Sequence, residues 1–249
     1  MDPAAALWRL GEDSAALCCG ALEGRVTFDD AGVRFVADRW QQQPCNRFRV
    51  LATGGPAERT PSLQVHERYV RGGDLVVTYE KTGPHRLAPQ IYWRASIDTA
   101  SAARLEMVLS VQTDLLDSSP HSTVCSVALH AKLLHAGGLA PSRFEEVASS
   151  ADEFDCSHGT EHLFVFRNEQ IGVSYAEMVH PSDFVSVQIH RDQERRPWMV
   201  ESMLFPERLE KGVIRRGRVC GWFLPAENDL AVAVELARRF VDEPPPLTA

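Results

Sequence analysis

Residues 25–36 read RVTFDDAGVRFV, and this stretch indicates the fold class. Val26 and Phe28 stand two apart before the polar turn signal, and Val33 and Phe35 stand two apart after it. Two alternating runs around a short turn are typical of an antiparallel β-hairpin. The stretch therefore predicts two paired strands with one apolar face.

The same two-residue period continues along most of the chain. Apolar residues alternate with polar ones in segments 48–50, 63–65, 75–79, 91–97, 105–111 and 125–129, and later in 163–165, 171–175, 185–189, 199–205 and 219–224. Strands with one apolar and one polar face favour antiparallel sheets. The sequence predicts a mainly β protein, either an antiparallel two-sheet sandwich or two similar β-rich halves.

One strong helix is predicted, over residues 227–241. Apolar residues recur there at helical spacing, at Leu230, Val234, Ala237 and Val241, and Asn228 or Asp229 is placed to cap the first turn. Pro244 and its two following prolines end the helix. Weaker helices are predicted at 4–10 and 142–149.

The 249 residues are expected to form a single structural unit, with a hypothetical internal duplication over 62–149 and 158–243. At an offset of 96, Arg71, Leu75, Val77, Thr78 and Tyr79 align with Arg167, Ile171, Val173, Ser174 and Tyr175. Two half-buried strands also match by chance, because they share the same alternating pattern. Both explanations stay open at this point.

Charge and composition limit the classes of partner. The net charge is −8, and the one local basic run, around Arg208, Lys211, Arg215, Arg216 and Arg218, contains the acidic residues Glu207 and Glu210. A protein that neutralises phosphates needs clustered cations, so we expect no nucleic-acid partner and interpret the run as a solvated strand edge. The first residues have neither a signal-peptide pattern nor a membrane span. With six scattered cysteines, we predict reduced thiols, a cytoplasmic location and no membrane partner.

A polar sheet face is the first candidate binding site. If Ile91, Trp93 and Ala95 point into the core, then Tyr92 and Arg94 point outward. The same argument places Gln188 and His190 outward on a second strand. Tyrosine, arginine, glutamine and histidine side chains suit a sugar or a small carboxylate, although a solvated sheet face has the same pattern.

A second candidate is the segment around Cys156, His158 and His162, which offers one thiol and two imidazoles. These are donors that zinc accepts, so zinc is the one cofactor considered. Their spacing matches no common structural zinc pattern, and an acidic surface loop explains the segment equally well. A Cys/His nucleophile is disfavoured because the surrounding carboxylates raise the pKa of a thiol.

In its overall pattern the chain resembles the galactose-mutarotase-like supersandwich, a family that binds sugars across a broad sheet. The pattern consists of a β-rich chain of this size with His, Arg, Glu and Trp on its strands. The Asn-His and His-x-Tyr stretches of that family and its late catalytic Glu have no counterpart here. His180-Pro181 followed by Phe184 is the nearest approach, and no catalytic residue is carried over.

The function predicted from the sequence is binding of a polar small molecule, such as a carbohydrate or organic acid, on a sheet face. One alternative is a metal-dependent or Cys/His hydrolase or isomerase. Another is an interaction or scaffold protein without a pocket, with its contact near Arg215–Arg218. The sequence predicts no oligomeric state.

Overall fold

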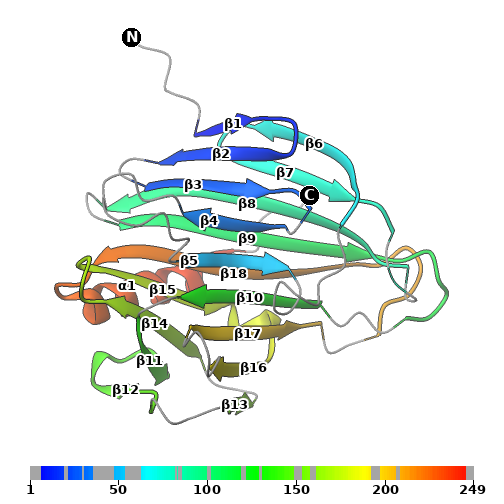
Figure 1. The fold of residues 1–249 in the computed structure, drawn as a ribbon. Coiled ribbons are helices and arrows are strands. Elements are labelled where there is room, and N and C mark those ends of the chain that lie inside the picture. The colour runs from blue at the N-terminus through cyan, green and yellow to red at the C-terminus, as the bar shows by residue number, and fades with distance from the viewer. Residues whose placement is uncertain are drawn as a thin grey trace.

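The computed structural model describes residues 7–19, 22–29, 31–35, 48–53, 63–81, 83, 86–99, 102–118, 122–128, 131–148, 153–157, 161–191, 197–205 and 208–244. Within these ranges the chain forms two nine-stranded sheets, in which the paired strands are antiparallel, and one α-helix near the C-terminus (Figure 1). The predicted fold class, an antiparallel two-sheet sandwich with a C-terminal helix, is confirmed.

Sheet A contains the N-terminal strands at one end and strands from the second half of the chain at the other. Its spatial order is β1 (Trp8–Leu10), β2 (Ser14–Cys19), β3 (Leu22–Thr27), β4 (Gly32–Phe35), β5 (Phe48–Thr53), β10 (Ser122–Ala128), β17 (Trp198–Leu204), β16 (Phe184–Arg191) and β13 (Glu153–Ser157).

Sheet B contains the longest strands. Its spatial order is β12 (Phe144–Glu146), β11 (Lys132–Gly137), β14 (His162–Asn168), β15 (Val173–Val179), β18 (Ile214–Pro225), β9 (Ala102–Gln112), β8 (Ala88–Thr99), β7 (Asp74–Tyr79) and β6 (Val65–Arg71). Two short 3-10 helices, Pro141–Arg143 and Pro181–Asp183, precede β12 and β16.

The hairpin predicted from residues 25–36 is present as β3 and β4. Val26 pairs with Val33 in its register, and both side chains are fully buried. Ala31, in the connecting turn, has a φ of 43°, a left-handed conformation that turns often require. The alternation in the sequence therefore identified the buried face of the hairpin correctly.

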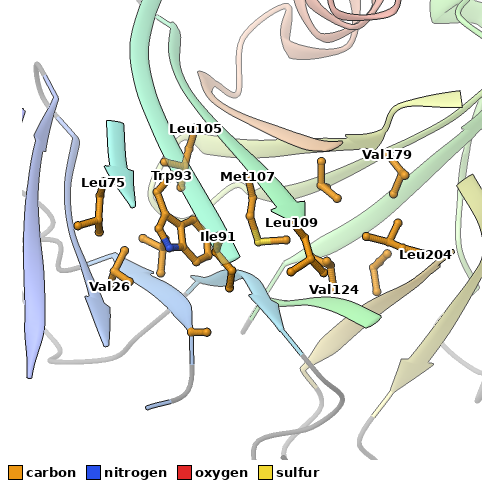
Figure 2. Close-up of a cluster of buried hydrophobic side chains, with 14 of the residues drawn as sticks. Val26, Leu75, Ile91, Trp93, Leu105, Met107, Leu109, Val124, Val179 and Leu204 are labelled. Carbon is orange, nitrogen blue, oxygen red and sulfur yellow. The ribbon is translucent and has the colours of Figure 1, made fainter. Parts of the chain in front are cut away.

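The main hydrophobic core lies between the two sheets. Figure 2 shows Val26, Val124 and Leu204 of sheet A gathered with Leu75, Trp93 and other apolar side chains of sheet B. These residues occupy every second position of their strands, so the opposite positions face away from the partner sheet. Each sheet thus has an inner face in the core and an outer face.

Helix α1 (Asp229–Asp242) covers part of the outer face of sheet B, against β14, β15 and β18 (Figure 1). Its buried apolar residues pack on a second core that includes Trp222, and they are Ala233, Val234, Leu236, Ala237 and Phe240. The helix ends within one residue of the predicted position. The outer face over β7 and β8 lies beyond β9, whose Arg104 reaches the Phe240 ring of α1.

The start of α1 differs from the predicted capping. The N-cap is Asn228, whose side chain makes no capping hydrogen bond. Asp229 instead is buried and accepts hydrogen bonds from Arg167, from Ser174 Oγ at 2.5 Å and from the backbone N–H of Leu230 at 2.8 Å. The first turn is therefore attached to sheet B through a buried carboxylate.

Both weaker helix predictions were wrong. Residues 8–10 form β1, and residues 142–148 contain the end of a single 3-10 turn followed by the three-residue strand β12, while residues 4–6 and 149 lie outside the described residues. In each case pairing with a neighbouring strand, β2 or β11, overrides a short helical signal. Among the described residues, no helix is long and apolar enough to cross a membrane.

The two segments that match at an offset of 96 both form hairpins of sheet B. One is β6–β7 and the other is β14–β15. After the first hairpin the chain continues into β8 of the same sheet, whereas after the second it crosses to β16 in sheet A. The internal duplication stays a prediction.

Candidate functional site

The outer face of sheet B carries polar side chains across β7, β8 and β9. On β8, Ile91, Trp93 and Ala95 are buried in the core between the sheets, so Tyr92 and Arg94 lie on the outer face as predicted. Residues that pair across antiparallel strands share a face. The strand register therefore identifies the residues of β7 and β9 that lie beside Tyr92 and Arg94 on the outer face.

The first cross-strand row is charged. Asp74, Arg94 and Glu106 are aligned in the register of β7, β8 and β9. Arg94 donates two hydrogen bonds to the Asp74 carboxylate, from Nε at 3.0 Å and from Nη2 at 3.1 Å. Its Nη1 lies 3.8 Å from Glu106 Oε2. The guanidinium thus lies between two carboxylates that belong to different strands.

This row continues to the end of helix α1. Arg104 Nη2 lies 3.3 Å from Glu106 Oε2, and both terminal nitrogens of Arg104 donate to the Glu243 carboxylate at 2.6 Å. Glu243 directly follows α1, so the ion pairs connect the outer face to the covering helix. The ring of Phe240 lies 5.7 Å from the Arg104 guanidinium carbon, a cation–π distance.

A second row is neutral and hydrogen-bonded. Tyr92 donates its hydroxyl hydrogen to Gln90 Oε1 at 2.9 Å, and Gln90 Nε2 donates to Thr78 Oγ1 at 2.9 Å. The cross-strand neighbours of Tyr92 are Val76 and Val108, both buried. The tyrosine ring therefore lies between two aliphatic side chains, with its hydroxyl fixed at one end.

Ser110 adds a hydroxyl without a partner to this face. It pairs with Gln90 in the register of β8 and β9 and is 5% exposed. Its Oγ makes no hydrogen bond to any described residue. A buried hydroxyl with no protein partner costs free energy, unless water or a ligand bonds to it.

Burial and neighbouring charges shift the pKa values of the charged side chains in the first row. Burial raises the pKa of Glu106 above its ordinary value, while Arg104 and Arg94 oppose that shift. The hydrogen bond to Asp74 raises the pKa of Arg94, and the hydrogen bond from Arg104 lowers the pKa of Glu243. The face thus holds permanent cations beside one carboxylate that is easier to protonate than usual.

Arg218 differs from its sequence interpretation as part of a solvated strand edge. It is 4% exposed, its backbone N–H donates to Asp183 Oδ2 at 3.0 Å, and its Nη1 donates to the Glu243 carbonyl at 3.3 Å. The guanidinium carbon lies 5.8 Å from the Phe240 ring. Arg218 therefore fixes the end of α1.

The four residues predicted on a polar face are not brought together. Tyr92 and Arg94 lie on the outer face of sheet B. Gln188 and His190 lie on β16 of sheet A, where their neighbours Val187 and Ile189 fill the core. The two pairs thus point away from the sandwich on opposite sides. Ligand contact by any of the four stays a prediction.

The predicted zinc ligands are also distributed over both sheets. Cys156 is in β13 at one edge of sheet A, His162 begins β14 of sheet B, and His158 lies outside the described residues. In the described part of the chain, no three His, Cys, Asp or Glu side chains form a group that could hold a metal. His162 Nδ1 instead lies 2.9 Å from His135 Nε2.

Sequence reasoning missed Asp74, Glu106, Arg104, Glu243 and His135. The alternating pattern contains a signal for the first two, because Asp74 and Glu106 occupy outward positions on strands adjacent to Arg94. Arg104 and Glu243 are 139 positions apart in the sequence, so local periodicity does not predict their contact.

Comparison with known proteins shows similarity in structure only. No protein-family model matches the chain, and no curated protein matches it in sequence. A putative aldose 1-epimerase from Klebsiella pneumoniae superposes with a TM-score of 0.53 and 10% identity, covering 97% of this chain and 90% of that one.

Two further solved structures have the same arrangement. A GalM/aldose epimerase homologue from C. elegans has a TM-score of 0.53 and 8% identity, covering 84% of this chain and 98% of that one. A galactose mutarotase-like protein from Clostridium acetobutylicum has a TM-score of 0.51 and 7% identity, covering 85% and 95%. The chain thus has the β-sandwich fold of aldose epimerase-like proteins, as its pattern suggested.

Proposed function

We propose that this protein binds a carbohydrate on the outer face of sheet B, over β7, β8 and β9. The observation that carries the proposal is the position of Arg94. Its guanidinium is between the Asp74 and Glu106 carboxylates, yet its side chain is 36% exposed, whereas that of Glu106 is 4% exposed. An oriented, accessible guanidinium beside fixed carboxylates offers donors and acceptors together.

The chemistry of this face suits sugar hydroxyls. A hydroxyl both donates and accepts, so it can bond to Arg94 and to Asp74 at the same time. The ring of Tyr92, set between Val76 and Val108, provides an apolar surface for the C–H face of a sugar. The Ser110 hydroxyl, which has no partner among the described residues, provides one further polar contact.

The structural neighbours support the same class of ligand. Their names describe a galactose mutarotase-like protein, an aldose epimerase homologue and a putative aldose 1-epimerase.

We further infer a cytoplasmic location, because Cys18, Cys19 and Cys220 are thiols rather than disulfides.

The test is binding of a panel of hexoses, pentoses and sugar acids, measured by calorimetry and by the shift of the thermal unfolding midpoint. Tyr92→Ala should abolish the shift because it removes the stacking ring, whereas Tyr92→Phe should keep most of it. Arg94→Lys should weaken binding, because an ammonium cannot donate two parallel hydrogen bonds to the Asp74 carboxylate and is therefore not held in the same orientation.

Gln188→Ala is the matched control, since Gln188 is a half-buried polar residue on the outer side of sheet A. It should bind sugars as the wild-type protein does. If no sugar in the panel binds, or if Tyr92→Ala and Gln188→Ala behave alike, the proposal is wrong.

A further inference from the structure

Two histidines from neighbouring strands face each other at the other end of sheet B. His135 Nε2, on β11, and His162 Nδ1, on β14, lie 2.9 Å apart. Their rings are nearly parallel, with centroids 5.2 Å apart and planes inclined by 20°. No residue of the carbohydrate face takes part in this pair.

The pair is held in place by the pairing of the two strands. In their register His135 is opposite Phe164, and the two rings stack with centroids 5.0 Å apart. Phe164 also stacks with His162 at 6.5 Å and is itself buried in the core between the sheets. Both imidazoles are half-buried, so they are oriented by packing but still accessible to solvent.

We propose that His135 and His162 together bind a divalent transition-metal ion of the class of Zn²⁺, Ni²⁺ or Cu²⁺. The separation of the facing nitrogens supports this. Metal–imidazole bonds are about 2.0–2.1 Å long, so two of them place their nitrogens about 2.9 Å apart at the right angle of a square-planar Cu²⁺ or Ni²⁺ site and about 3.3 Å apart at the tetrahedral angle of Zn²⁺. The two facing nitrogens share a hydrogen bond of 2.9 Å, which differs from these separations by less than about half an ångström.

The protonation state of the pair favours metal binding. Burial lowers the pKa of both imidazoles, and His162 adds to the effect on His135, whose pKa falls to about 4. Both rings are therefore neutral at pH 7, which is the form that binds metals. When the ion binds, the hydrogen between the two facing nitrogens leaves, either to the other nitrogen of its ring or to solvent, so that both facing lone pairs bind the metal.

The donor set decides which ions are expected. Neutral imidazole nitrogens suit zinc, nickel and copper, whereas calcium and magnesium require oxygen ligands. Two protein ligands leave further coordination positions to water or to another donor, as in an open metal site. The bound ion would also link β11 to β14 and so stabilise one end of sheet B.

His162 belongs both to this pair and to the zinc site predicted from the sequence, whereas His135 belongs to the pair alone. The pair includes neither Cys156 nor His158. Metal binding by the pair is independent of carbohydrate binding, because the pair is on β11 and β14, while the carbohydrate face is on β7, β8 and β9 of the same sheet.

The experiment uses full-length protein without a histidine tag, stripped of metal by EDTA and then dialysed. Zn²⁺ is titrated by calorimetry, and Cu²⁺ binding is followed by electron paramagnetic resonance, which detects nitrogen ligands directly. We expect saturation at one ion per chain and coupling to two nitrogens. A large excess of Ca²⁺ or Mg²⁺ should not compete.

His135→Ala and His162→Ala should each weaken Zn²⁺ binding by at least about tenfold, because loss of even a supporting group costs that much in metal sites. Should either alanine variant fail to fold, the double glutamine variant His135→Gln with His162→Gln retains polar side chains of similar size. His66→Ala is the control, since His66 is an exposed histidine hydrogen-bonded to Glu80 at 2.8 Å. Absence of saturable binding, or wild-type binding by the double variant, would overturn the proposal.

Discussion

Tyr175 donates its hydroxyl hydrogen to Glu177 Oε2 at 2.6 Å, inside the core between the two sheets. Ser126, from β10 of the other sheet, donates a hydrogen bond to the same oxygen. Glu177 is 1% exposed, and its second oxygen has no partner among the described residues. A carboxyl group thus joins the two sheets where the surroundings are apolar.

This contact predicts that stability depends on pH. Burial raises the pKa of Glu177 to about 7, although hydrogen bonds from Ser126 and Tyr175 oppose the shift. Between its ordinary pKa and about 7, the folded protein keeps a proton that the unfolded chain has lost. Stability therefore falls as pH rises through this window and levels off above it, by a total of about 3 kcal/mol.

The measurement is the free energy of unfolding in denaturant at several pH values between 4.5 and 8. Glu177→Gln carries no titratable group and should remove this component of the pH dependence. Glu235→Gln, on the exposed side of α1, should leave it unchanged. An equal slope in wild-type and Glu177→Gln proteins would contradict the prediction.

Tyr175 also explains why residue 221 is a glycine. A Cβ built at Gly221 would overlap the Tyr175 hydroxyl oxygen and would lie 2.5 Å from the ring. Gly221→Ala should therefore destabilise the protein by about 1–3 kcal/mol, the usual cost of overfilling a core. Thermal or denaturant unfolding measures it. Gly137→Ala is the control, because a Cβ there meets nothing within 4 Å; equal losses in both variants would refute the explanation.

The attachment of α1 through Asp229 predicts a further effect on stability. Arg167 donates to Asp229 from Nε at 2.8 Å and from Nη2 at 2.6 Å, and the carboxylate is buried. Asp229→Ala leaves the half-buried guanidinium without this partner and should cost about 2 kcal/mol or more in unfolding free energy. Glu235→Ala removes only an exposed i,i+4 pair and should cost less than about 0.5 kcal/mol. Comparable losses would indicate that the Asp229 contact does not anchor the helix.

Cysteine and histidine variants separate the two metal hypotheses. If Cys156, His158 and His162 form the site predicted from the sequence, alanine at each position should reduce Zn²⁺ affinity. If the site is the His135–His162 pair, Cys156→Ala and His158→Ala should bind zinc like the wild type. Calorimetry on the same metal-free protein distinguishes the outcomes, because only the first hypothesis requires a sulfur ligand.

The sequence alone determined the alternation of buried and outward residues and the position of the final helix. Val26 and Val33, Ile91 and Trp93, and the apolar stripe of α1 were all identified from local periodicity. The physical reason is that side-chain direction follows a period of two in strands and 3.6 in helices. A residue's face is therefore a local property of its own element.

Only the tertiary structure decided which outward residues share a site. Arg94 and His190 follow the same local pattern, yet they lie on different sheets, because strand order depends on pairing between distant segments. His135 and His162 meet only because β11 pairs with β14, and Arg104 meets Glu243 only because α1 packs on sheet B. These contacts arise from long-range pairing and packing, which local periodicity does not encode.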